Sequence, residues 1–221
     1  MHSLSSSIRK SGVVNLSKTI SDENCSVIRE FIDNYDSQEA EINYGGTEKR
    51  IWNAEKLCPE ISEFANFSNE IVSEASGKKM QCYSILAYQN APCDINKFGL
   101  GRWHCDSFRS QLKVFNFLKP VEPENGPLEI LLKTHSSIFK ALGLVSGTYI
   151  SPRDLFSNNM KRKYQRVDEQ YINLITKLGI KSRKMTTKDS GESFLVDSSA
   201  LHRASPLLSG ERYALCAYFR H

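Results

Sequence analysis

The sequence lacks the features of a membrane protein and of a disulfide-bonded secreted domain. None of its apolar runs approaches the roughly 18 residues that a helix needs to cross a bilayer. Its six cysteines form no C-x-x-C pair, and no apolar secretory segment precedes them. With a formal net charge of only +4, the chain also lacks the strong basic excess typical of nucleic-acid-binding proteins. We therefore expect a protein of a reducing compartment, by default the cytoplasm, with no membrane partner.

The chain does have the composition of an ordinary soluble protein. Of its 221 residues 40% are hydrophobic and 24% are charged, which is enough chain to bury one sizeable core. We therefore expect a single domain. No internal repeat is detectable, and no pattern predicts an oligomeric state.

Helical patterns dominate the first third of the chain. Residues 1–19 are Ser-rich without acidic residues, and we expect a poorly ordered tail that leads into a short strand at 13–16. Ser21 can cap a helix over about 22–35, in which apolar residues recur at helical spacing. A second helix is expected over 59–76. Both helices are interpreted as packing material.

From residue 81 onward the pattern is that of short strands. Runs of β-branched and aromatic residues are separated by Pro, Gly, Asn and Asp, and the Asn125-Gly126 pair is typical of a tight turn. A helical pattern at 167–178 interrupts these runs. The expected strands lie at 81–88, 111–118, 127–132, 192–196 and 212–219.

Three residues form a candidate metal site. His104 and Asp106 are two positions apart on a stretch that we expect to be extended, so their side chains project to the same face. His202 follows a later strand-like run. Two histidines and one carboxylate are the facial set that holds Fe(II) and leaves coordination positions open. A single H-x-D tripeptide carries little weight alone, because it also occurs by chance in exposed loops.

Four ordered motifs over residues 81–219 resemble the phytanoyl-CoA dioxygenase-like branch of the Fe(II)/2-oxoglutarate-dependent oxygenases. Trp103-His104-Cys105-Asp106 is similar to the W-H-x-D of that family, and Asn125-Gly126-Pro127-Leu128 to its N-G-P-L segment. Lys133-Thr134-His135 stands where the family often has P-G-S-H. Leu201-His202 followed by Arg212 resembles the distal histidine and the arginine that binds the cosubstrate.

This resemblance implies a function and a set of site residues. His104, Asp106 and His202 would bind Fe(II), and Arg212 would pair with the distal carboxylate of 2-oxoglutarate, because a guanidinium fork matches a carboxylate. The implied reaction couples oxidative decarboxylation of 2-oxoglutarate by O2 to hydroxylation of a C–H bond in a small molecule, with ascorbate as a possible aid. Tyr88 and Lys113 are further candidates for cosubstrate binding, with an ordinary barrel or surface position as the alternative for each.

The resemblance also implies the fold. It is a double-stranded β-helix, a mainly β jelly roll with flanking helices. We expect helical support at 20–78, the barrel at 80–150 and 190–220, and a helical basic insertion at 151–188. From Arg153 to Asp189, ten basic residues stand against four acidic ones, which favours an anionic substrate; a solvated basic helix face is the alternative.

Several departures from the family pattern leave alternatives open. His135 lacks the Pro-Gly context and is interpreted as a turn or packing residue. Ala204 replaces a frequent cosubstrate-binding serine, for which Ser205 could substitute. Tyr218 stands where nucleic-acid repair relatives carry a second arginine, which argues against a nucleic-acid substrate, and the carboxylate of Asp106 argues against halogenation. The remaining alternatives are an inactive jelly-roll binding module, a nucleic-acid- or protein-modifying oxygenase of the same fold, and a metal hydrolase.

Overall fold

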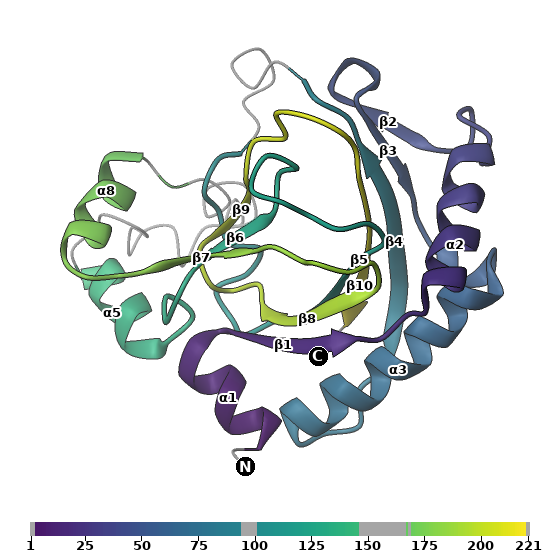
Figure 1. Ribbon diagram of the computed structural model, residues 1–221. Coiled ribbons are helices and arrows are strands. Elements are labelled where there is room, and N and C mark those ends of the chain that lie inside the picture. The colour runs from purple at the N-terminus through teal and green to yellow at the C-terminus, as the bar shows by residue number, and fades with distance from the viewer. Residues whose placement is uncertain (1–2, 94–100, 146–166, 168, 220–221) are drawn as a thin grey trace.

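The strands form two facing antiparallel sheets in the computed structural model, which describes residues 3–93, 101–145, 167 and 169–219. The large sheet has the order β1-β8-β5-β10-β4-β3-β2 and the small sheet the order β7-β6-β9 (Figure 1). This is the jelly-roll architecture expected from the sequence. The strands are β1 (Val13–Lys18), β2 (Glu41–Asn43), β3 (Glu48–Ile51), β4 (Cys82–Asn90), β5 (Leu112–Phe117), β6 (Leu128–Leu131), β7 (Ser182–Met185), β8 (Glu192–Asp197), β9 (His202–Ala204) and β10 (Arg212–Phe219).

Three helices cover the outer face of the large sheet: α1 (Leu4–Ser11), α2 (Asp22–Asn34) and α3 (Pro59–Ser76) (Figure 1). The Ser21 hydroxyl accepts a hydrogen bond from the Asn24 amide at the start of α2, as the sequence predicts. Apolar side chains of these helices pack on alternate residues of the central strands. Buried members of this outer core include Ile28, Ile32, Ile61, Phe64, Val72, Ile85, Val114, Leu195 and Leu215.

A second core lies between the two sheets. Phe117 of β5 and Phe194 of β8 meet edge to face with ring centroids 5.8 Å apart, and Ile130 and Met185 reach them from the small sheet. Because the central strands of the large sheet are buried on both faces, they lack the simple alternation of an exposed sheet. Polar side chains occupy inward-facing positions that this core does not fill, and they form the candidate site.

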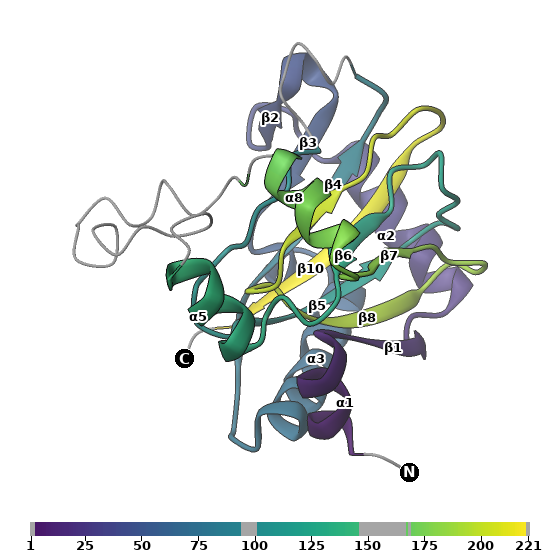
Figure 2. The same ribbon diagram turned by 90° about the vertical axis from the view of Figure 1, so that its left-hand side faces the viewer.

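Two helices lie beyond the small sheet, α5 (Ser137–Val145) and α8 (Glu169–Lys177) (Figure 2). Ile172 and Ile175 of α8 pack with Trp103, Leu131 and Leu201 in a third apolar cluster. Trp103 is therefore a core residue, as expected. No helix in the described ranges combines the length and the apolar character that crossing a membrane requires.

The structure corrects the sequence predictions at several places. The expected disordered tail contains α1, because Ser3 caps its start and Gly12 closes its end at φ 83°. The expected helical insertion contains α8, but Ser182–Met185 is strand β7, paired with β6; residues 151–166 and 168 lie outside the described residues. Helix α5 falls within the range expected for the barrel. The short strands β2 and β3 and the 3-10 turns η1 (Tyr44–Gly46) and η2 (Ala54–Lys56) have no clear sequence signal.

Gly191 gives a stability prediction, because it joins the helical layer to the large sheet. Its φ is +81°, and a Cβ there would clash with the Ile20 carbonyl oxygen. A side chain at position 191 is therefore unfavourable for two reasons, the left-handed backbone conformation and the clash with the neighbouring backbone. We expect Gly191→Ala to lower the free energy of unfolding by about 2–5 kcal/mol, measured by urea denaturation.

The matched control is Gly179→Ala. Gly179 has φ +97°, but a Cβ there would meet nothing within 4 Å, so only the backbone cost of about 1–2 kcal/mol applies. Equal losses for the two variants would contradict the close approach at Gly191.

Candidate metal centre

Backbone pairing brings His104 and His202 together from distant parts of the chain. The amide of each donates to the carbonyl of the other, with N–O distances of 2.9 and 2.8 Å. The imidazole Nδ1 atoms lie 3.0 Å from the Arg102 carbonyl and 2.9 Å from the Ala200 carbonyl, respectively. Donation from Nδ1–H to a carbonyl fixes the tautomer in which Nε2 is free to act as a ligand.

Asp106 completes the group. Its carboxylate lies 3.9 Å from His104 Nε2 and 3.7 Å from His202 Nε2, and its amide donates to the Ser198 carbonyl. Oδ2 also accepts a 2.8 Å hydrogen bond from the Lys113 ammonium. One donor atom from each of the three residues lies within 4.8 Å of the others, and no other group of this kind occurs in the described part of the chain.

The surroundings of His202 and Asp106 favour the protonation states that bind a cation. Burial lowers the pKa of His202 to about 4 and outweighs the opposing effect of Asp106, so its imidazole is neutral near pH 7. Burial alone would raise the pKa of Asp106, but His202 and the Lys113 ammonium outweigh it and hold that pKa below its ordinary value. A neutral imidazole and an ionised carboxylate are the forms that bind a metal.

The donor set fits a divalent transition metal. Ligands at right angles on an octahedral ion with bonds of about 2.1 Å lie about 3 Å apart. The 3.7 and 3.9 Å separations from Asp106 to the two imidazoles therefore need to close by less than about 1 Å, and the two imidazole ligand atoms, which lie within 4.8 Å of each other, by less than about 2 Å. Two imidazoles and one carboxylate suit Fe(II) in a facial arrangement. The remaining coordination positions would be open to small ligands.

Arg212 lies on the inner face of β10, and strand register sets its surroundings. Arg212 of β10 pairs with Asn90 of β4, which in turn pairs with Glu48 of β3. The guanidinium donates to the Asn90 side-chain oxygen at 2.8 Å and to the Gly126 carbonyl. It is 7% exposed, and its Nε has no hydrogen-bond partner. No carboxylate among the described residues pairs with this buried cation, so the site can accept one.

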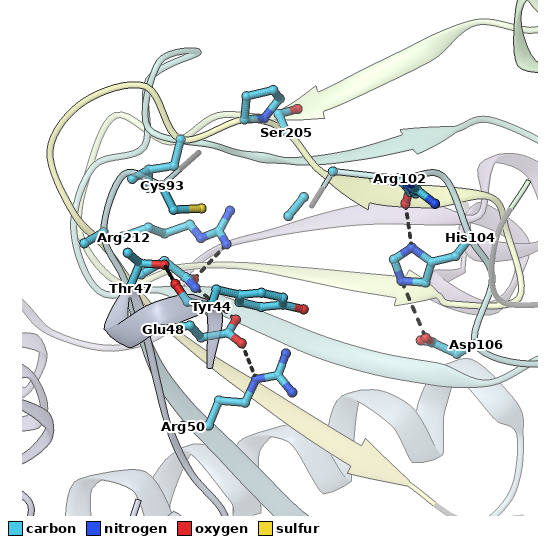
Figure 3. A pocket seen from close by; sticks show the side chains of 16 residues that line it. Tyr44, Thr47, Glu48, Arg50, Cys93, Arg102, His104, Asp106, Ser205 and Arg212 are labelled. Carbon is cyan, nitrogen blue, oxygen red and sulfur yellow. Dashed lines mark hydrogen bonds and ion pairs between the residues drawn. The ribbon is translucent and has the colours of Figure 1, made fainter. Parts of the chain in front are cut away.

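A cavity of about 470 Å³ connects the two features. Figure 3 shows Arg212 on one side of it and His104 with Asp106 on the opposite side. The wall between them includes Ala204 and Ser205. The rest of the lining consists of Tyr44, Thr47, Glu48, Arg50, Asn90, Ala91, Cys93, Gly101, Arg102, Pro206 and Leu207.

Other residues singled out in the sequence occupy different positions. The Tyr88 ring lies 5.9 Å from the Arg212 guanidinium, and burial raises its pKa to about 12. Lys113 does not line the cavity and instead contacts Asp106. His135 bonds the Arg9 carbonyl in a turn beside Gly12, which confirms it as a packing residue.

The cavity wall contains residues that the sequence did not single out. Asn90 donates to Glu48 at 2.9 Å while it accepts from Arg212. Arg50 lies 2.8 Å from Glu48 and reaches Glu41 at 3.4 Å. These residues come from β2, β3 and the end of β4, whose short polar patterns do not differ from those of surface strands.

The basic segment is described only in part. Arg183 and Lys184 are exposed on β7, and Arg183 donates to the Asn15 side chain. Lys177 ends α8. Residues 153–166, with five of the ten basic side chains, lie outside the described residues.

No protein-family model and no curated protein sequence matches this chain. Solved structures do match. The epimerase SnoN, in complex with Fe3+, alpha ketoglutarate and nogalamycin RO, gives a TM-score of 0.69 at 11% identity, over 98% of this chain and 81% of SnoN. The carbocyclase SnoK from nogalamycin biosynthesis, described as non-heme and alpha ketoglutarate dependent, gives 0.67 at 14% identity, over 96% and 80%. HygX from Streptomyces hygroscopicus, with nickel, 2-oxoglutarate and hygromycin B bound, gives 0.62 at 10% identity, over 96% and 84%. At these identities the likeness establishes a shared fold.

Proposed function

We propose that this protein is a non-haem Fe(II)/2-oxoglutarate-dependent oxygenase. The observation that carries the proposal is the cavity itself. His104 and Asp106, which form a cluster with His202, line it at one side, and a buried guanidinium without a carboxylate partner among the described residues lines it at the other. A keto acid with a second, distal carboxylate has the complementary chemistry. The similarity of the fold to SnoN, SnoK and HygX supports the same conclusion.

Each residue of the site has a proposed task. Nδ1–H donation by His104 and His202 directs their Nε2 atoms to the metal, and Asp106 supplies the anionic ligand. Arg212, oriented by Asn90, binds the distal carboxylate of 2-oxoglutarate. When bound, Fe(II) would supply the redox chemistry by which 2-oxoglutarate, O2 and a C–H substrate become succinate, CO2 and the hydroxylated product.

We further propose a small-molecule substrate and hydroxylation as the outcome. After 2-oxoglutarate is accommodated, the cavity of about 470 Å³ has room for a compact metabolite. SnoN and HygX hold nogalamycin RO and hygromycin B, respectively. The basic residues of the 153–188 segment favour an anionic group on the substrate. The W-H-x-D and N-G-P-L motifs support membership of the phytanoyl-CoA dioxygenase-like branch as part of this proposal.

The proposal is tested by succinate formation. Protein freed of metal by a chelator is supplied with Fe(II), 2-oxoglutarate, O2 and ascorbate, and succinate and O2 consumption are measured together. We expect slow uncoupled turnover, with one succinate formed per O2, that requires both Fe(II) and 2-oxoglutarate and is faster with a matching substrate. Binding of 2-oxoglutarate to the Ni(II)-loaded protein, followed by calorimetry, is the parallel measurement. Absence of both turnover and binding would contradict the proposal and favour an inactive binding module.

A further inference from the structure

Lys113 is a buried lysine whose ammonium group is held between an anion and an aromatic ring. It is 5% exposed, and it comes from the inner face of β5. Its Nζ lies 2.8 Å from Asp106 Oδ2 and 4.0 Å from the ring centroid of Tyr218, the residue opposite it on β10. Asp106 is its only carboxylate partner among the residues that the structure describes. Burial of an ammonium group without an anionic partner at hydrogen-bond distance is costly, and Asp106 supplies that partner.

Both carboxylate oxygens of Asp106 face an imidazole, but only one of them contacts the lysine. Oδ2 accepts from Lys113 and lies 3.7 Å from His202 Nε2, whereas Oδ1 lies 3.9 Å from His104 Nε2. A positive charge within hydrogen-bond distance of Oδ2 repels a divalent cation from that oxygen. The electrostatics therefore favour metal binding through Oδ1 alone.

The number of carboxylate oxygens that bind matters for the proposed reaction. Carboxylates bind cations through either one or both oxygens. An octahedral ion with three single-atom protein ligands has three positions left, two for the keto acid and one for O2. Binding through both oxygens of Asp106 would leave only two positions, and the keto acid would then fill the site.

We propose that Lys113 is a positioning residue that restricts Asp106 to metal ligation through one oxygen and so keeps the third open position. This inference rests on the proposed function. It assigns Lys113 a different task from direct cosubstrate binding, in keeping with its absence from the cavity wall.

The test counts the water molecules on bound Mn(II), a redox-stable probe, from the broadening of its EPR lines in 17O-enriched water. We expect three waters in the wild-type protein and two in Lys113→Met, whose unbranched apolar side chain preserves the bulk of lysine. In the same proteins loaded with Ni(II), we expect the Kd for 2-oxoglutarate to rise at least about 10-fold in the variant.

The matched control is Lys140→Met. Lys140 is also 5% exposed, but its ammonium donates to the Phe108 carbonyl and the Ser199 hydroxyl, both at 2.7 Å, away from the metal ligands. The Lys140→Met substitution removes an equally buried lysine. We expect three waters on its bound Mn(II) and an unchanged Kd for 2-oxoglutarate.

Each outcome bears on the inference. Two waters in the wild-type protein, or three in Lys113→Met, would overturn it. A variant with weaker Mn(II) binding but an unchanged water count would show that Lys113 only anchors Asp106. If Lys113→Met fails to fold, Lys113→Leu, a second apolar replacement, takes its place with the same expected count of two waters. Three waters without 2-oxoglutarate binding in the wild-type protein would refute the proposed function but retain the one-oxygen ligation, and no Mn(II) binding at all would refute both.

Discussion

Replacing Arg212 with methionine is expected to weaken 2-oxoglutarate binding to the Ni(II)-loaded protein by at least about 30-fold, with little change in the affinity for Ni(II). The guanidinium is buried, and its charge is not paired with a carboxylate of the described chain. Loss of one partner of a buried, hydrogen-bonded charge pair costs about 2–5 kcal/mol, which corresponds to about 30-fold or more in Kd. Calorimetric titration with 2-oxoglutarate measures the effect.

Arg203→Met is the matched control for this prediction. Arg203 is a partly buried arginine that pairs with Glu129 at 2.9 Å and lies over the Trp103 ring, outside the cavity lining. Its loss should leave the Kd for 2-oxoglutarate within about 2-fold. Arg212→Lys should fall in between, since lysine retains the charge without the planar fork. Equal effects of the Arg212 and Arg203 variants would argue against a carboxylate at Arg212.

His104→Ala is expected to reduce the affinity for divalent metal by about 100-fold or more and to abolish succinate formation. Four-ligand zinc sites gain about 10–16 kcal/mol in all, so one ligand contributes about 3 kcal/mol, or about 100-fold in Kd. The fold should survive, because the side chain of His104 is 34% exposed and its backbone pairing with His202 does not need the imidazole. Competition with a chromophoric chelator measures the metal Kd.

His135→Ala tests whether this loss is specific to the site. Like His104, His135 has one ring nitrogen 3.0 Å from a backbone carbonyl, so both substitutions remove a comparable local contact. We expect His135→Ala to bind metal as the wild-type protein does, with at most a small loss of stability. A similar loss of metal affinity in both variants would remove the basis for the metal centre.

The metal ligands could be predicted from sequence because their chemistry is local. His104 and Asp106 share a face of an extended segment whatever the rest of the chain does. His202 could be proposed from its place after a strand-like run and from its resemblance to a family motif. The cross-chain pairing that joins it to His104 is not visible in either segment alone. The five main strands and the two long helices were predicted for the same reason, from strong local patterns.

The far wall of the cavity could not be predicted, because register between strands creates it. Glu48, Asn90 and Arg212 form a row only after β3, β4 and β10 have paired. Likewise the contact of Lys113 on β5 with Asp106 depends on where the segment that contains Asp106 passes the large sheet, so it has no counterpart in sequence spacing. The prediction of a poorly ordered tail was wrong because two capping residues stabilise α1, a short helix with one buried side chain, Ile8.

The two halves of the proposed site are attached to different layers of the protein. His202 belongs to the small sheet, whereas Arg212 belongs to the large one. A molecule bound by both would link the two sheets. A small change in the distance between the two sheets would therefore change the length that a ligand needs in order to contact both. The apolar filling around Phe117 and Phe194, which sets that spacing, thus also sets the length of the molecule that fits.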